Sequence, residues 1–422
     1  MSTPSRRKSA SANAPLGRTT TLIETLQYST ILHLAAFGLY AYVFFLPGTL
    51  QLLTLLSPIN FKSLENLPDK RHFRLLYICV VTRGTNVATV RRGAEHMAGL
   101  LSIDARLRFV ILTEEQAVPH FADLYGVELV GVPVEYRPSK ARFKARSLEY
   151  FRTEKAIRND DWVLHLDEET LVDEHATQSC ISFIQKEVTH DYGQGCLLYN
   201  SVNYWDNALL TYADLGRARD DFGRFQFAHN VLHFPINGVH GSFLLIRGIV
   251  ENTVGWNTES FVEDFWFTDW LQAWKLGFSG GFIPSFAREQ SCSTIPDFLR
   301  QRRRWTCGIW NLSGGFRATG LIGKCICWLN GNLDTFPMET TACSPLPFWL
   351  YAYICFYHGA SQASLAISCV LQDVDARVSL LRICQHVALL PFYSVGTGAL
   401  HLAALGYSII DPAKSFDIVR KA

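Results

Sequence analysis

Uncharged apolar stretches near both ends of the chain enclose a central region with a different pattern. Residues 29–56, 345–371 and 387–410 contain no Asp, Glu, Lys or Arg. A helix of about 20 apolar residues crosses the hydrocarbon core of a bilayer, so we predict a transmembrane segment in each stretch. Residues 1–28 are rich in Ser, Thr, Ala and Arg, lack apolar periodicity, and are predicted to form a disordered N-terminal tail.

The central region, residues 60–320, is predicted to be the catalytic domain. Short apolar runs alternate with helical patterns, which predicts an α/β fold with a mostly parallel sheet covered on both faces. Ligands bind such sheets at the carboxyl ends of the strands. The runs predicted as strands are residues 75–81, 109–112, 127–134 and 162–166, and those predicted as helices are 90–101 and 141–158.

Charge and cysteine usage narrow the class of protein. The formal charge of +1 gives no basic field for binding nucleic acid. Eleven cysteines without a CxxC pair argue against a disulfide framework and for a reducing compartment. Cys325 and Cys327 lack two further ligands nearby for zinc, so we interpret them as apolar residues near a membrane. Basic residues balance on the two sides of residues 29–56, which favours neither membrane orientation.

An acidic run follows the fourth predicted strand, in the sequence His165-Leu166-Asp167-Glu168-Glu169-Thr170. Strand alternation would place Asp167 and Glu169 on one side, where they could share a divalent cation, Mg²⁺ or Mn²⁺, that bridges a diphosphate. The alternative is a solvated acidic turn that caps the next helix. His165 is interpreted as a packed side chain at the strand end and not as a metal ligand.

Two further motifs follow in the sequence. Glu263 and Asp264 open an aromatic helix, where Asp264 could act as a general base or the pair could simply cap the helix. Residues 301–305, Gln-Arg-Arg-Arg-Trp, could stabilise a departing nucleotide diphosphate and stack a sugar, or could lie on a membrane surface. Upstream, a basic helix start that includes Lys144 could contact the donor phosphates, and a solvated face is the alternative.

As an ordered set, these motifs resemble the family 2 inverting glycosyltransferases, and more closely the Egghead-type β-1,4-mannosyltransferases. The resemblance covers roughly residues 70 to 315. It rests on five segments: the acidic run at residues 165–170, Lys144-Ala145-Arg146-Ser147-Leu148-Glu149-Tyr150, Phe225-Gln226-Phe227, Val262-Glu263-Asp264, and residues 297–305.

The resemblance implies a GT-A-like domain that binds a nucleotide-diphosphate sugar. It assigns Asp167 and Glu169 to the cation and Asp264 to the base. Here the cation motif is D-x-E rather than the family's D-x-D. Residues 237–243 keep the family's Gly-Ser pair but differ around it, which leaves the acceptor more open than the chemistry. The remaining expected site residues are Thr82, Arg83, Glu114, Lys144 and Glu168 on the donor side, and Glu263, Gln301, Arg304 and Trp305 beside the acceptor and diphosphate.

From this resemblance we expect a membrane-bound inverting enzyme that transfers a hexose, mannose from GDP-mannose, to a lipid-linked acceptor such as glucosylceramide. The expected site is the ER, the Golgi or the plasma membrane, with the catalytic domain facing the cytosol. The alternatives are a processive polysaccharide synthase, glycosylation of a small lipophilic natural product, and an inactive membrane scaffold.

Overall fold

The structure is a computed structural model that describes residues 68–235, 238–271, 276–313 and 348–414. The predicted tail, the predicted membrane segment at residues 29–56, and Cys325 and Cys327 lie outside these ranges. Within them, none of the cysteines whose side chains are described forms a disulfide.

The described strands form one eight-stranded sheet in the order β3-β2-β1-β4-β7-β6-β8-β5. β7 and β5 run against the other strands, so the sheet is mixed but mostly parallel, as the sequence predicts. The strands are β1 Leu76–Val81, β2 Leu107–Glu114, β3 Val127–Val132, β4 Trp162–Asp167, β5 Leu171–Val172, β6 Tyr192–Leu198, β7 Leu244–Arg247 and β8 Gly280–Arg288.

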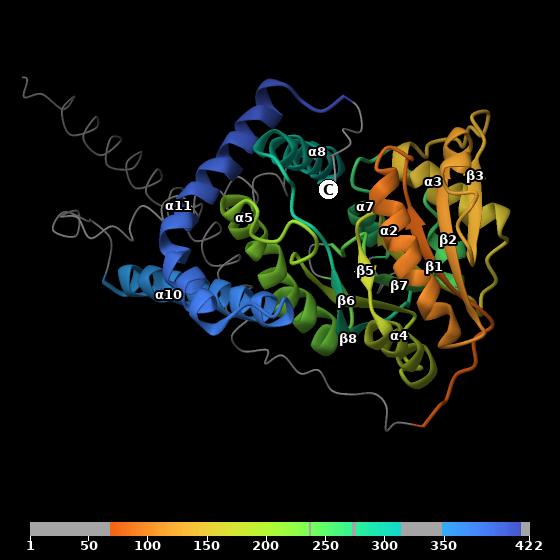
Figure 1. Cartoon of the computed structure of the whole chain (residues 1–422), viewed down its shortest axis with the longest axis horizontal. Coiled ribbons are helices and arrows are strands. Elements are labelled where there is room, and N and C mark those ends of the chain that lie inside the picture. The colour runs from red at the N-terminus through yellow and green to blue at the C-terminus, as the bar shows by residue number, and fades with distance from the viewer. Residues whose placement is uncertain (1–67, 236–237, 272–275, 314–347, 415–422) are drawn as a thin grey trace, which may run out of the picture. The chain divides into compact units, whose positions relative to one another are not determined.

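Helices cover both faces of the sheet (Figure 1). The α-helices are α2 Val87–Ala98, α3 Phe143–Glu154, α4 Glu174–Lys186, α5 Ala208–Asp220, α6 Gly248–Val254, α7 Glu263–Leu271, α8 Ile295–Ser313, α10 Phe348–Asp375 and α11 Leu380–Ile410. Short 3₁₀ segments span Gly99–Ser102 and Glu115–His120, and two π-helical turns span Asp221–Phe225 and Ala228–Leu232.

The alternating side chains of β1 show why the sheet needs cover on both faces. Ile78 and Val80 pack with α2 and α4 in one apolar core. Tyr77 and Cys79 point the other way, into a second core with α3, α6 and α7. Successive residues of a strand face opposite sides, so a run of consecutive apolar residues requires two covered faces. The predicted α/β class with a mostly parallel sheet is confirmed, while the flanking transmembrane helices stay a prediction.

The register of the parallel strands gathers several chain segments at one edge. Val81, the last residue of β1, lies opposite Asp167, the last residue of β4, and also opposite Leu112 near the end of β2. The residues that follow these strands are therefore neighbours, although more than 80 positions separate Thr82 from Glu168.

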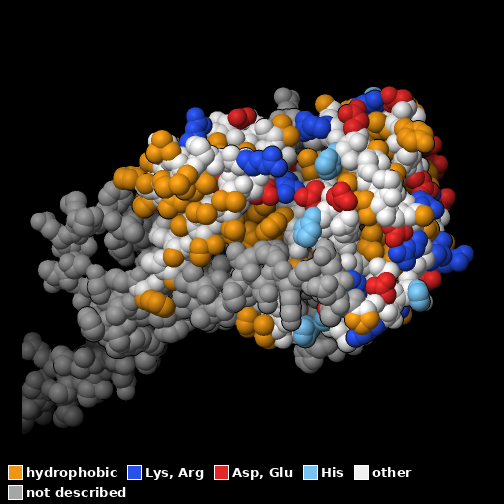
Figure 2. Space-filling model, turned by 60° about the horizontal axis from the view of Figure 1, so that its bottom comes forward, with side chains coloured by type: hydrophobic (Ala, Val, Ile, Leu, Met, Phe, Trp, Pro, Cys, Tyr) orange, Lys and Arg blue, Asp and Glu red, His pale blue; other side chains and the backbone are white. Residues whose placement is uncertain are grey.

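The C-terminal helices α10 and α11 pack against α5, and α11 also packs along α8. Among the described helices, α11 is the one whose length and apolar composition suit a membrane crossing, with a mean hydropathy of 1.4 over its best window. It contains the predicted segment 387–410, while residues 348–371 of the other predicted segment fall in α10. Membrane insertion of either segment stays a prediction. Figure 2 shows apolar side chains crowded on the side of the molecule that α10 and α11 form. The exposed large apolar residues of α11 include Leu381, Phe392 and Ile410.

Candidate active site

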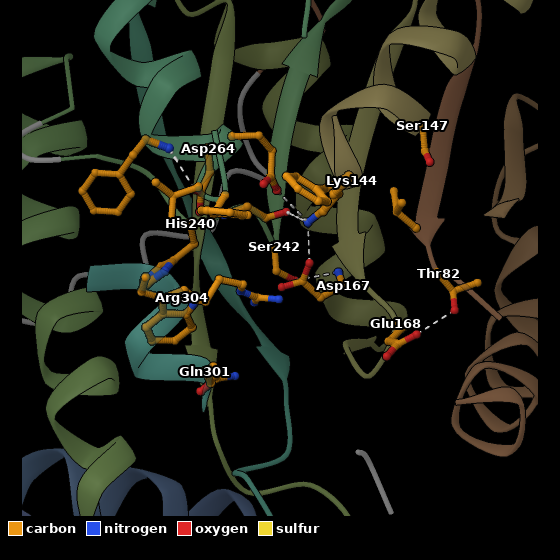
Figure 3. A pocket seen from close by; sticks show the side chains of 18 of the residues that line it. Thr82, Lys144, Ser147, Asp167, Glu168, His240, Ser242, Asp264, Gln301 and Arg304 are labelled. Carbon is orange, nitrogen blue, oxygen red and sulfur yellow. Dashed lines mark hydrogen bonds and ion pairs between the residues drawn. The ribbon is translucent and has the colours of Figure 1, made fainter. Parts of the chain in front are cut away.

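A cavity of about 780 Å³ opens at the carboxyl ends of β1, β2 and β4, and helices α3, α5, α7 and α8 contribute its other walls. Every site residue predicted from the sequence lines it, and Figure 3 shows several of them facing one another. The structure thus brings together groups that are up to 223 positions apart in the chain, from Thr82 to Trp305.

The acidic run forms a turn and does not continue the strand. β4 ends at Asp167, and the amide of Thr170 donates to the Asp167 carbonyl at 3.0 Å. Glu168 and Glu169 occupy the middle of this turn. The prediction that strand alternation aligns Asp167 with Glu169 was therefore wrong in its premise, because an i to i+3 hydrogen bond closes the chain there. Both carboxylates nevertheless line the same cavity.

The middle carboxylate, Glu168, connects the acidic turn to β1 and α2. Thr82 Oγ1 donates to Glu168 Oε2 at 2.6 Å, and Asn86 Nδ2 donates to Glu168 Oε1. Asn86 immediately precedes α2. Glu168 therefore fixes the position of the turn relative to the end of the first strand.

Lys144, near the start of α3, places a cation among the carboxylates. Its Nζ donates to Asp167 Oδ1 and lies 3.4 Å from Glu263 Oε1. Burial would lower the pKa of Lys144, but the charges of Asp167 and Glu263 outweigh burial and raise it. Lys144 therefore stays protonated and offsets part of the negative charge of this cluster.

Asp264 lies at the start of α7 and is held by two backbone amides. Gly241 N donates to its Oδ2 at 3.0 Å, and Phe265 N donates to its Oδ1 at 2.8 Å. A Cβ at position 241 would lie 3.2 Å from Asp264 Oδ2, so glycine permits this close approach. Burial and the charge of Glu263 raise the pKa of Asp264 to about 6, although Lys144 opposes the shift. A carboxylate with such a pKa is suited to accept a proton near neutral pH.

The three consecutive arginines of α8 have three different environments. Arg304 lines the cavity, where burial lowers its pKa while Glu263, Asp167 and Asp264 oppose that shift. Arg302 instead pairs with buried Asp214 of α5, at 2.5 Å. Arg303 contacts Asp411, just past α11, at 2.7 Å. The interpretation of this segment as a purely surface-bound basic helix does not describe Arg302, which is 7% exposed.

The neighbours of the cavity-lining Gln301 and Trp305 are also ordered. Gln301 Oε1 accepts from Arg302 Nη1 at 3.1 Å. The guanidinium groups of Arg302 and Arg217 lie 4.2 and 4.8 Å from the centre of a Trp305 ring, close enough for cation–π contact.

The expected donor residues Arg83 and Glu114 also line the cavity. Both oxygens of Glu114, at the end of β2, accept from Arg146 Nη1 at 3.0 and 3.1 Å. Arg83 follows β1 and is exposed. His165 is buried and its Nε2 pairs with Glu251, in agreement with its interpretation as a packed side chain.

Several cavity residues were missed by the sequence analysis, among them Arg217, His240 and Glu289. His240 Nε2 pairs with fully buried Asp221 in a π-helical turn, and Glu289 directly follows β8. Ser242 belongs to the Gly-Ser pair noted above but was given no role. A charged residue directly after a strand was a usable signal for Glu289. No local pattern marked Arg217.

The residues at the acidic turn fit a divalent cation that is shared with a substrate. Within the described ranges, no group of three or more His, Cys, Asp or Glu side chains is arranged to hold a metal. Asp167 and Glu169 do supply two carboxylates to one cavity. Mg²⁺ is typically bound by one or two carboxylates together with water and substrate phosphates. This donor set is therefore suited to a cation that arrives with a diphosphate.

Comparison with known proteins bears on the identity of the chain. A profile described as glycosyl transferase family group 2 matches residues 162–392. The chain is 30% identical over 285 residues to the β-1,4-mannosyltransferase egh of Drosophila melanogaster. It is 31% identical over 277 residues to the β-1,4-mannosyltransferase bre-3 of Caenorhabditis elegans. These alignments cover 64% and 62% of this chain and 61% and 60% of those proteins, so it spans about three-fifths of the length of the curated relatives it matches.

Among solved structures, the mannosyltransferase PcManGT from Pyrobaculum calidifontis, in complex with GDP-Man and Mn²⁺, has a TM-score of 0.43 and 13% identity, over 89% of this chain and 100% of that chain. The family profile itself spans more than half of the chain, including Asp167, Asp264 and all of α8. The chain belongs to glycosyl transferase family group 2.

Proposed function

We propose that this protein is an inverting mannosyltransferase that uses GDP-mannose and a lipid-linked acceptor such as glucosylceramide to form a β-glycosidic bond. The observation that carries the proposal is that Asp264 and the acidic turn line the same cavity. Asp264 has a pKa of about 6, and Asp167 and Glu169 line the same space. The names of the relatives from fly and nematode support the choice of mannose.

On the donor side, Asp167 and Glu169 would hold a divalent cation, which neutralises the charge of a bound diphosphate and of the departing nucleotide. Lys144 lies against Asp167 and adds a second positive charge at this point. Glu168 and Thr82 hold the acidic turn against the end of β1, and Arg83 and Glu114 flank the nucleotide. These assignments follow the order of the strand ends along the sheet.

On the acceptor side, Asp264 accepts the proton of the acceptor hydroxyl. That oxygen then forms a bond to the anomeric carbon of the sugar as the bond to the diphosphate oxygen breaks on the opposite face. One displacement inverts the configuration, so an α-linked donor gives a β-linked product. Arg304 stabilises the charge that develops on the leaving diphosphate, and Trp305 packs against the acceptor, with Glu263 and Gln301 lining the same wall.

The exposed apolar residues of α10 and α11 support a lipid acceptor. Phe392 and Ile410 are 67% and 86% exposed, and α11 also packs along α8, which carries Arg304 and Trp305. A membrane that covers these residues would bring a glycolipid headgroup close to the part of the cavity lined by Arg304 and Trp305 of α8.

The proposal is tested by a donor and acceptor screen in membranes that contain the full chain. Radiolabelled GDP-mannose and UDP-sugars are compared with and without glucosylceramide, and the product is digested with α- and β-mannosidases. We expect a single mannose in β linkage, formed only with GDP-mannose and glucosylceramide. Transfer from UDP-sugars alone would contradict the proposed donor, and polymeric products detected by mass spectrometry would instead indicate a processive synthase.

A further inference from the structure

A chain of buried hydroxyl groups runs behind the acidic turn. The Asp167 amide donates to Ser242 Oγ at 3.2 Å, and Ser242 Oγ lies 2.7 Å from Thr170 Oγ1. Thr170 Oγ1 in turn donates to Glu289 Oε1 at 2.9 Å. Thr170, Ser242 and Glu289 are each no more than 2% exposed. The acidic turn is thus connected at both of its ends, Asp167 and Thr170, to a carboxylate that follows β8.

The direction of each hydrogen bond in this chain is fixed by the number of protons available. A carboxylate only accepts, so Thr170 must give its single hydroxyl proton to Glu289. The Thr170 oxygen is then left to accept from Ser242, and the Ser242 oxygen accepts from the backbone amide of Asp167. Glu289 therefore sets the direction of this series of hydrogen bonds. Without its acceptor oxygen, neither Ser242 nor the Asp167 amide is oriented to receive the hydroxyl proton of Thr170.

The second oxygen of Glu289 faces the opposite wall of the cavity. Glu289 Oε2 lies 3.7 Å from Arg217 Nη2, and the Arg217 guanidinium lies over the rings of Tyr199 and Trp305, at 4.1 and 4.8 Å. Burial alone would lower the pKa of Arg217, but its acidic and phenolic neighbours raise it, so Arg217 stays charged. Through Arg217, Glu289 also acts on the position of Trp305.

We propose that Glu289 is a positioning residue that couples the two walls of the active site. One of its oxygens orders the turn that carries Asp167 and Glu169. The other holds Arg217 against the ring of Trp305. This role rests on the proposed function, in which the turn receives the cation and diphosphate and Trp305 receives the acceptor. Glu289 itself contacts neither substrate in this scheme.

The proposal predicts that the two branches can be separated by substitution. Thr170→Val removes the hydroxyl chain and should weaken binding of Mn²⁺ with GDP by about 10-fold, since groups that orient cation ligands typically contribute 10- to 100-fold to affinity. Arg217→Lys keeps the charge but loses the flat stacking group, and should raise the acceptor KM several-fold without changing Mn²⁺ binding. Glu289→Met, which removes both acceptor oxygens, should produce both effects.

The experiment measures Mn²⁺ binding in the presence of GDP by electron paramagnetic resonance, and the acceptor KM by sugar transfer, for all three variants of the full chain. Thr170→Ser keeps the hydroxyl and should restore binding, while Glu154→Gln removes an exposed carboxylate outside the cavity and should change neither quantity. A Glu289→Met variant that folds but alters one branch only, or neither, overturns the coupling role.

Two further outcomes keep the test decisive. Should Glu289→Met fail to fold, as judged by circular dichroism, equal Mn²⁺ affinity in Thr170→Val and Thr170→Ser still overturns the proposal. Failure of the proposed function gives a different result, because wild-type protein would then transfer no mannose while Mn²⁺ and GDP binding still differed between the Thr170 variants.

Discussion

The two walls of the cavity differ in both construction and charge. The strand wall consists of strand ends and the turn after β4, and it presents Asp167, Glu168 and Glu169 around Lys144. The helical wall consists of α5, α7 and α8, and it presents Arg217, Arg304 and Trp305.

This difference indicates how one site can bind a diphosphate that must later leave. Under the proposed function, the acidic wall would bind the diphosphate with the help of Lys144 and a divalent ion, so we expect donor binding to depend on metal. The arginine wall needs no such help and is suited to stabilise charge that appears during the reaction. Asp264 and Glu263 are the acidic exception on the helical side, and both lie close to Lys144, which bridges the two walls.

The largest effect is expected where the two walls meet. Asp264→Asn keeps the shape of the side chain but removes the base, and should lower kcat by about 10³-fold. Donor binding should change little, because Asp264 belongs to the helical wall. Steady-state transfer and GDP binding measure the two effects, with exposed Asp206→Asn as a matched control. Near-normal kcat would remove Asp264 from the mechanism.

Arg302 tests whether the helical wall depends on its buried ion pair. Arg302→Met removes the nearer cationic partner of buried Asp214 and leaves it the more distant Arg217, at 3.9 Å, so it should lower the free energy of unfolding by about 3 kcal/mol. Denaturant unfolding in detergent measures this loss. Arg300→Met, which removes a half-exposed partner of Asp297, is the control and should have little effect. A loss of equal size in both variants would show that burial of the pair is not the cause.

Arg304 tests catalysis by the same helix. Arg304→Gln keeps a polar side chain but removes the charge that faces the leaving group, and should lower kcat by about 10²-fold with little change in stability. Both kcat and the free energy of unfolding are measured for Arg304→Gln and compared with those of Arg302→Met, which should mainly lose stability. If Arg304→Gln mainly destabilises the protein, its assignment to the cavity chemistry is wrong.

The bridging role of Lys144 can be read from a pH profile. Asp264 must be ionised to act as a base, so kcat/KM of the wild type should fall as the pH drops through about 6. Lys144 favours the ionised form of Asp264, so Lys144→Met should raise the pKa of Asp264. The acidic limb of the profile should then move to higher pH by about one unit. An unchanged limb would separate Lys144 from Asp264.

The smallest effect is expected at the end of α11. Asp411→Asn breaks the contact with Arg303, but the Asp411 side chain is 54% exposed, so the free energy of unfolding should fall by less than about 1 kcal/mol. The same denaturant series measures it. A larger loss would mean that α11 stabilises α8 through this contact and not mainly through apolar packing.

Much of the strand wall could be predicted because its determinants are local. A buried strand followed directly by three acidic residues indicates the edge where ligands bind, and the parallel register then brings Thr82 and Glu168 together. The prediction erred in applying strand alternation to Asp167 and Glu169, because strand periodicity does not show where a turn closes. The structure places Asp167 and Glu169 in the cavity by a different backbone path.

The helical wall was predictable only as a set of motifs. The family resemblance assigned Arg304 to the site, but the residue types of the three adjacent arginines in α8 give no physical reason why Arg304 is the one that faces the cavity. That assignment depends on Asp214 and Asp411, which lie on distant elements. Likewise, the coupling role proposed for Glu289 depends on its contact with Arg217, at a sequence separation of 72 residues.

The sequence by itself determined the α/β class, the order of the motifs and the resemblance to the family, because apolar periodicity and short motifs are properties of neighbouring residues. Only the tertiary structure decided how the charges are shared: which arginine is structural, why the pKa of Asp264 is raised, and how Glu289 reaches both walls. Those properties depend on burial and on the distance between charges, which arise when segments far apart in the chain pack together.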